Sequence, residues 1–181
     1  MEPVEIAAGA FQLQPWAPHD AQEVFAACQD PDIQRWTRVP SPYSLADAEL
    51  FVGTISPAGW REGTGASFAV KDATTGRLLA SVGLHGISPR DRSAELGYWA
   101  APWARGEGVT TAGSRAVCRW AFDSGLVDHI QWLAEVGNDA SRRIAAKLGF
   151  VEDGILRARL LARGGVRADA WHATLLKGEL R

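Results

Sequence analysis

The stretch ELGYWAAPWARGEGVTTAG, residues 95–113, joins a strand-like segment to a segment whose apolar residues have helical spacing. Gly106 and Gly108 lie at the junction, and Arg105 precedes them. A helix start presents unpaired N–H groups and the positive end of the helix dipole, and glycine lets the backbone approach a ligand without a Cβ atom. The stretch therefore predicts an anion cradle suited to phosphate or pyrophosphate. The alternative is a tight strand-to-helix turn that binds nothing.

The loop lacks two familiar nucleotide-binding motifs. It has no Gly-Lys-Ser/Thr sequence, so it is not a P-loop. The third glycine of the dinucleotide-binding fingerprint is also missing, because position 111 is Thr and the next glycine is Gly113. The preceding strand is the third of an antiparallel meander instead of the first of a βαβ series. These exclusions favour a phosphate cradle of another family.

Length and composition are those of an ordinary globular chain. The 181 residues, 46% hydrophobic and 22% charged, predict one domain over residues 1–181. A net charge of −2 provides no basic field, so neither nucleic acid nor a membrane surface is an expected partner. No apolar run approaches the roughly 20 residues that span a bilayer. The acidic start, MEPVE, does not resemble a signal peptide, so a cytoplasmic location is expected.

The two cysteines argue against a metal centre. Cys28 and Cys118 both lie in helix-like segments and form no metal-ligand pair. They are predicted to be small core residues in a reducing compartment. No metal is therefore expected.

Further patterns place strands and helices around the loop. A capping box is expected at Asp20 and Glu23, opening a helix that Pro31 ends, and SLAD (44–47) opens a second helix through Ile55. Two later helices are expected, one after Gly108 and one within NDASRRIAAKLGF (138–150), which ends at Gly149 as a C-cap. Strands are predicted at 11–16, 66–73, 77–87, 94–100 and 130–136, followed by a final hairpin across RGGVRA (163–168). This order predicts an α+β fold with helices on the faces of the sheet and one parallel crossover.

Two spaced motifs resemble one family. ELGYW (95–99) with RGEGVTTAG (105–113) is similar to the motif region of GNAT N-acetyltransferases, particularly the RimJ/RimL-like branch that acetylates ribosomal-protein N-termini. A second family element matches within 138–150. Its matching positions are Asn138, Ser141, Arg143, Ile144, Lys147, Gly149 and Phe150. Two motifs in the right order are more specific than either one alone.

The resemblance implies a fold and a donor. The fold would be a GNAT fold, with a mixed, mostly antiparallel twisted sheet of about six to seven strands, helices on both faces, and a V-shaped splay between the fourth and fifth strands. The donor would be acetyl-CoA or another acyl-CoA, with its pyrophosphate on the N–H groups from Arg105 to Thr110 and its pantetheine arm in the splay. A homodimer is a family-level expectation. The implied cofactor-binding residues are Trp99, Arg105, Gly106, Glu107, Gly108, Val109, Thr110, Asn138, Ser141 and Arg143.

Acyl transfer from a thioester to an amine needs a base, a hydrogen-bond donor to the carbonyl oxygen and a weak acid. Glu95 is predicted as the general base, directly or through a water; the alternative is a sheet-edge carboxylate that is either solvated or paired with Arg90 or Arg92. Ser141 is predicted to protonate or hydrogen-bond the departing sulfur, and Tyr98 is an alternative acid. The structural alternative for Ser141 is a hydroxyl that bonds the backbone at a helix start. The structural alternative for Tyr98 is an aromatic ring that only packs against its neighbours.

Trp36 and His85 are predicted on the acceptor side. Trp36 is one of eight tryptophans, for which core or dimer-interface packing is the alternative. His85 is a candidate because the reference pKa of histidine suits acid–base chemistry at neutral pH, although a half-buried structural strand histidine is the more frequent case. The expected acceptor is a primary amine, on a peptide or protein N-terminus or a small molecule. The competing hypothesis is a catalytically silent acyl-CoA-binding regulatory or interaction module. Two departures from the family pattern motivate it: Ala145 stands where many members have a tyrosine acid, and the branched Thr110 lies in the cradle.

Overall fold

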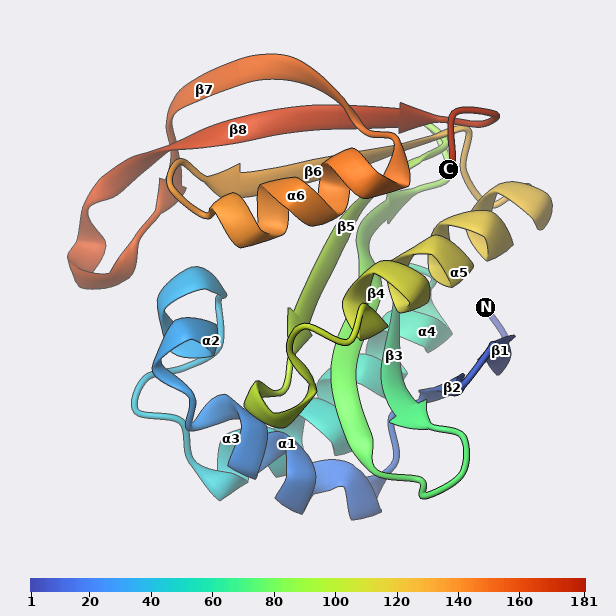
Figure 1. Ribbon diagram of the computed structural model, residues 1–181, viewed down its shortest axis with the longest axis vertical. Coiled ribbons are helices and arrows are strands. Elements are labelled where there is room, and N and C mark those ends of the chain that lie inside the picture. The colour runs from blue at the N-terminus through green and yellow to red at the C-terminus, as the bar shows by residue number, and fades with distance from the viewer.

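The computed structural model describes residues 1–181, and its central feature is an eight-stranded sheet (Figure 1). The strands follow the order β1-β2-β3-β4-β5-β6-β8-β7, and every neighbouring pair is antiparallel except β5–β6. Their bounds are β1 (Ile6–Ala8), β2 (Phe11–Pro15), β3 (Gly65–Asp72), β4 (Leu78–Ser88), β5 (Ser93–Ala100), β6 (His129–Glu135), β7 (Val151–Leu161) and β8 (Arg167–Leu176). The mixed α+β fold is confirmed, with one strand more than expected. The added strand, β1, has three residues, too few to show an alternating pattern.

The helices lie on both faces of this sheet. They are η1 (Pro18–Asp20), α1 (Ala21–Cys28), α2 (Pro31–Trp36), α3 (Leu45–Leu50), η2 (Phe51–Ile55), α4 (Ser56–Glu62), η3 (Pro102–Ala104), α5 (Val109–Asp123), α6 (Asp139–Leu148) and η4 (Arg163–Gly165). Helix α5 packs closely on β3 and β4: a Cβ atom at Gly113 would lie 3.2 Å from Val70 Cγ2 and 3.3 Å from Val82 Cγ2. On the opposite face, Val24 of α1 and Ala48 of α3 form a second apolar cluster with Ala69.

Strands β5 and β6 pair only at one end. Their parallel register runs from Ser93–His129 to Glu95–Gln131, whereas β5 continues to Ala100 and β6 to Glu135. Beyond Glu95 the two strands diverge, and Figure 1 shows the gap opening toward α2. The expected V-shaped splay between the fourth and fifth predicted strands is thus confirmed. It leaves the facing backbone edges of both strands without a cross-strand partner.

The capping box predicted at the start of the first helix was wrong. The Asp20 side chain does not cap α1; instead it accepts a hydrogen bond from the N–H of Ala17 and forms a buried ion pair with Lys71, 2.6 Å away. Glu23 accepts from the N–H of Leu78, so no capping box forms. The expected end of this helix before Pro31 is confirmed, because α1 ends at Cys28 and Pro31 begins the separate six-residue helix α2. Asp20 and Glu23 thus contact Lys71 and Leu78 of the sheet instead of capping α1.

The second cap pattern is confirmed. The Ser44 side chain accepts from the N–H of Asp47, and Asp47 accepts in return from the N–H of Ser44. The helix that follows continues beyond its expected end at Ile55, through the π-helical turn η2 and into α4, until Gly63 adopts a left-handed conformation with φ of 71°. Gly149 caps α6 in the same way, as predicted, with φ of 101°.

Candidate functional site

The loop between β5 and α5 presents a row of free backbone donors. No atom of the chain accepts a hydrogen bond from the N–H groups of residues 106–110. Gly106 and Gly108 have φ of 85° and 76°, values that favour glycine, and a Cβ atom at either would meet nothing within 4 Å. Gly108 is the N-cap residue of α5 and supplies no side-chain cap. The loop therefore combines unpaired donors, open space and the positive end of a 15-residue helix, which are the requirements of a phosphate cradle.

The branched residue in this loop does not fill the open space. Thr110 is only 6% exposed, in the first turn of α5, beside the buried Val109. Its hydroxyl makes no hydrogen bond within the chain and is not among the completely enclosed polar atoms. A hydroxyl in that condition can still bind a ligand oxygen. Glu107 is exposed.

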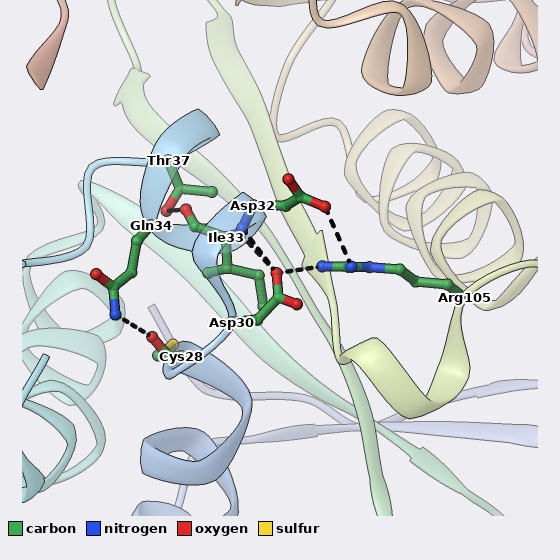
Figure 2. Close-up of polar contacts among 7 residues, drawn as sticks. All are labelled: Cys28, Asp30, Asp32, Ile33, Gln34, Thr37 and Arg105. Atoms are coloured by element: carbon green, nitrogen blue, oxygen red, sulfur yellow. Dashed lines mark hydrogen bonds and ion pairs between the residues drawn. The ribbon is translucent and has the colours of Figure 1, made fainter.

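Arg105 connects this loop to the start of α2 (Figure 2). Its guanidinium lies 2.5 Å from Asp30 Oδ1 and 3.4 Å from Asp32 Oδ2. Asp30 also caps α2 by accepting from the N–H groups of Asp32 and Ile33. Partial burial by itself raises the pKa of Asp30, but the hydrogen bonds from Arg105 and these N–H groups hold it below its ordinary value. The positive charge predicted at the edge of the cradle is therefore already paired with two carboxylates.

The other end of α2 contacts the far side of the splay. Arg35 pairs with Glu135 at the end of β6 at 2.5 Å, and its guanidinium lies 4.2 Å from the ring centroid of Trp36. Arg163, in η4, donates to the carbonyl oxygens of Gln34 and Val39. Helix α2 thus connects the β5–α5 loop to the end of β6 across the mouth of the splay. The half-buried Trp36 lies at the β6 end, where a Cβ atom on Gly137 would be 3.8 Å from its ring.

A second connection crosses the splay on the other face of the sheet. The Tyr98 hydroxyl of β5 donates to the backbone carbonyl of Ser141 at 3.0 Å, and the Ser141 hydroxyl donates to Tyr98 Oη at 3.0 Å. Trp132 of β6 donates its indole N–H to Ser141 Oγ at 3.1 Å. The predicted acids Ser141 and Tyr98 are therefore joined. The sequence analysis did not single out Trp132, and only its place on the strand before Asn138 could have drawn attention to it.

Burial raises the pKa of Tyr98 well above its ordinary range, although the hydrogen bonds with Ser141 and Trp132 lower it. A buried phenol of this kind stays protonated, so it can donate a hydrogen bond but does not readily lose its proton. Burial likewise raises the pKa of the Cys118 thiol to about 12, which keeps that group unreactive.

The start of α6 is capped. Asn138 is the N-cap residue, and its Oδ1 accepts a hydrogen bond from the N–H of Ser141. Both residues therefore have a structural role at the start of this helix. The Nδ2 group of Asn138 has no acceptor in the chain and is available to a ligand. Arg143 is exposed and forms no ion pair, whereas Arg142 pairs with Glu152 at 2.5 Å.

Glu95 lies at the base of the splay, at the last β5–β6 pair. Its side chain is 32% exposed and lies 3.6 Å from the guanidinium of Arg38, not from Arg90 or Arg92. His85 is directly opposite Glu95 on β4. Loss of hydration among the surrounding protein atoms lowers the pKa of His85, Glu95 opposes this shift, and Arg38 adds to it. Because side chains alternate along a strand, Glu95 and Tyr98 lie on opposite faces of β5.

Trp99 and His172 lie outside this arrangement. Trp99 shares the face of Glu95, and its ring centroid is 6.3 Å from that of Trp16 in the apolar cluster beneath α1 and α3. Its side chain therefore packs away from α5, and only its backbone borders the splay. His172 pairs with Asp153 at 2.9 Å on the β7–β8 hairpin. No group of three or more His, Cys, Asp or Glu side chains is arranged to hold a metal ion. None of the helices is both long and apolar enough to cross a membrane.

A sequence profile of the GNAT acetyltransferase domain matches residues 11–151, and the chain belongs to this family of acetyltransferases. A Bacillus subtilis (strain 168) protein named "Putative ribosomal N-acetyltransferase YdaF" is 35% identical over 104 residues. That alignment covers 58% of this chain and 56% of the relative, little more than half the relative's length. The curated relatives that match this chain are named as acetyltransferases, so the hypothesis of a catalytically silent acyl-CoA-binding module has no support among them.

Solved structures agree with this assignment. The crystal structure described as "Probable acetyltransferase" superposes with a TM-score of 0.83 at 27% identity, covering 97% of this chain and 98% of that one. RimL, a ribosomal L7/L12 alpha-N-protein acetyltransferase solved in complex with coenzyme A, superposes with a TM-score of 0.86 over 96% of this chain and 98% of its own, at 16% identity. The second likeness shows the shared fold.

Proposed function

We propose that this acetyltransferase moves an acetyl group from acetyl-CoA to the primary amine of a peptide or protein N-terminus. The observation that carries the proposal is the row of unpartnered N–H groups at residues 106–110 beside an open splay. Five consecutive donors at the start of α5 suit a pyrophosphate, and the free strand edges suit an extended amide-bearing arm. The ribosomal acetyltransferase named among the relatives supports a peptide acceptor. A small-molecule amine is the alternative acceptor.

The residues that would bind acetyl-CoA lie along this loop and the splay. The N–H groups from Gly106 to Thr110 would hold the pyrophosphate, with the Thr110 hydroxyl as a further donor and Arg105 at the edge. The exposed Arg143 would reach the outer phosphate. The Nδ2 group of Asn138 would position the thioester carbonyl, because its Oδ1 is committed to the helix cap. Bound there, acetyl-CoA supplies the activated acetyl group.

The two faces of β5 divide the chemistry. Glu95 takes the proton of the attacking amine on the face where His85 and Arg38 lie. Ser141 and Tyr98 lie on the other face and stabilise the negative charge on the departing sulfur. The amine and the thioester then meet through the splay, from opposite faces of the sheet. This arrangement fits direct transfer between two bound substrates, without a covalent enzyme species.

The test measures free thiol released from acetyl-CoA in the presence of peptides with free N-termini and, separately, of polyamines and other small amines. Turnover with peptides is the expected result. Glu95→Gln should then lower the rate most at low pH, where the amine is protonated, and leave CoA affinity nearly unchanged. A pH–rate profile identical to that of the unmodified protein would remove Glu95 as the base. Absence of CoA binding in calorimetry would overturn the whole proposal.

A further inference from the structure

The three side chains that cross the splay form a hydrogen-bond chain of fixed direction. Trp132 Nε1 lies 3.1 Å from Ser141 Oγ, which lies 3.0 Å from Tyr98 Oη, which in turn lies 3.0 Å from the carbonyl oxygen of Ser141. An indole N–H can only donate, and a carbonyl oxygen can only accept. The Ser141 oxygen must therefore accept from Trp132, and the hydroxyl protons must run from Ser141 to Tyr98 and from Tyr98 to the carbonyl.

This direction limits what Ser141 can do at rest. Its proton is directed at Tyr98, and one of its two lone pairs is used by Trp132. To donate to a departing sulfur, the Ser141 hydroxyl must rotate, and Tyr98 is then free to turn its own proton from the carbonyl to Ser141 Oγ. The bond from Trp132 is the one contact that stays the same in both arrangements. It holds the oxygen in place while the two hydroxyl protons change partners.

We propose that Trp132 is a positioning residue for acetyl transfer, acting through Ser141. The 1%-exposed indole fixes the Ser141 oxygen beside the splay and, by donating to it, makes the hydroxyl a better hydrogen-bond donor toward the leaving thiolate. This inference rests on the proposed function. No bond is made or broken at Trp132, and its indole stays neutral throughout.

The test is a double-mutant cycle on Trp132→Phe and Ser141→Ala. Trp132→Phe keeps an aromatic ring in the core and removes the N–H donor. We expect kcat to fall by about 3- to 10-fold, the value of one lost hydrogen bond, with the KM for acetyl-CoA unchanged. In the Ser141→Ala background the same substitution should lower kcat no further, because the group through which it acts is gone. A drop of equal size in both backgrounds, or no drop in either, overturns the proposal.

A matched control is Trp60→Phe. Trp60 is 2% exposed and also donates its indole N–H, to the Ser67 carbonyl oxygen at 3.3 Å, away from the splay. Its substitution removes a comparable buried hydrogen bond, so kcat should stay within about twofold of the unmodified protein if the effect at Trp132 is specific. A Trp60→Phe loss as large as that of Trp132→Phe would mean that general loosening of the core lowers kcat.

A spectroscopic measurement keeps the test decisive if Trp132→Phe does not fold. The indole N–H resonance of Trp132 should move in Ser141→Ala and again when coenzyme A is added to the unmodified protein. An indole resonance indifferent to both changes overturns the inference. The proposed function fails separately, when the unmodified protein neither binds coenzyme A nor turns over acetyl-CoA with any amine.

Discussion

Helices α5 and α6 each follow a strand that borders the splay, yet their N-termini are built in opposite ways. At α6, Asn138 accepts from the N–H of Ser141, and Asp139 adds a negative charge to the first turn. At α5, Gly108 has no side chain to offer, and the first turn contains no acidic residue. The start of α6 has a side-chain cap, whereas the first N–H groups of α5 have no acceptor in the chain. Leaving a helix start uncapped costs stability, and this cost is consistent with the binding role proposed above for the start of α5.

The largest expected effect comes from filling the uncapped start. Gly108→Val places a branched side chain in the open space beside the donors and strains a backbone with φ of 76°. We expect the Kd for coenzyme A to rise by about tenfold or more in calorimetry, with about 1–2 kcal/mol lost from the free energy of unfolding. Gly76→Val is the control, because Gly76 has φ of 73° and equally open surroundings in the β3–β4 turn. Equal affinities for the two variants would refute the cradle.

Removing the cap of α6 should affect stability more than donor binding. Asn138→Ala leaves the N–H of Ser141 without its acceptor, and we expect a loss of about 1 kcal/mol in urea unfolding. Asn138→Asp keeps a side-chain oxygen for the cap but lacks the Nδ2 donor. Its free energy of unfolding should therefore match that of the unmodified protein, whereas its kcat should be several-fold lower than that of the unmodified protein. If Asn138→Asp recovers both, Asn138 serves the helix alone.

The ion pair between Arg105 and Asp30 offers a further test of the uncapped start of α5. The guanidinium of Arg105 is the positive charge beside that start, and it is paired with a carboxylate at the start of α2. Asp30→Asn keeps a side-chain acceptor for the cap of α2 but removes the carboxylate that competes for Arg105. Coenzyme A should bind about two- to fivefold more tightly at low salt, and the gain should shrink above about 0.5 M salt. Asp32→Asn, at the longer contact, should change the affinity less. A gain that is independent of salt would contradict this electrostatic origin.

The smallest effect is a pH dependence at His85. Its folded-state pKa lies below the ordinary value of 6.5, so the folded protein binds fewer protons there than the unfolded chain does. The free energy of unfolding should therefore decrease as the pH falls from about 7 through the folded pKa, by less than about 1 kcal/mol at this exposed position. His85→Gln should reduce the difference between unfolding curves at pH 7.5 and 5.5. An unchanged difference would show that other groups cause it.

Local patterns predicted most of the strands, the longer helices and the position of the loop before α5. The alternation of β3–β5, the helical spacing after Gly108 and the C-cap at Gly149 all depend on residues a few positions apart, and the structure has each of them. The prediction failed at Asp20, where a local capping box competes with Lys71, which is buried on β3. Asp20 is buried and pairs with Lys71 in place of the helix cap, and the local sequence pattern contains no information on this burial.

The family, the α+β order and the loop from Gly106 to Thr110 at the start of α5 were predictable from residues close together in the chain. The contacts that bridge the splay were not predictable in this way. Arg105 meets Asp30 from 75 positions away, Arg35 meets Glu135 from 100, and Tyr98 meets Ser141 from 43. A cap or a turn is satisfied by its neighbours in the chain, whereas these partners lie far apart in sequence and meet because the folded chain brings β5, β6 and α2 together around the splay.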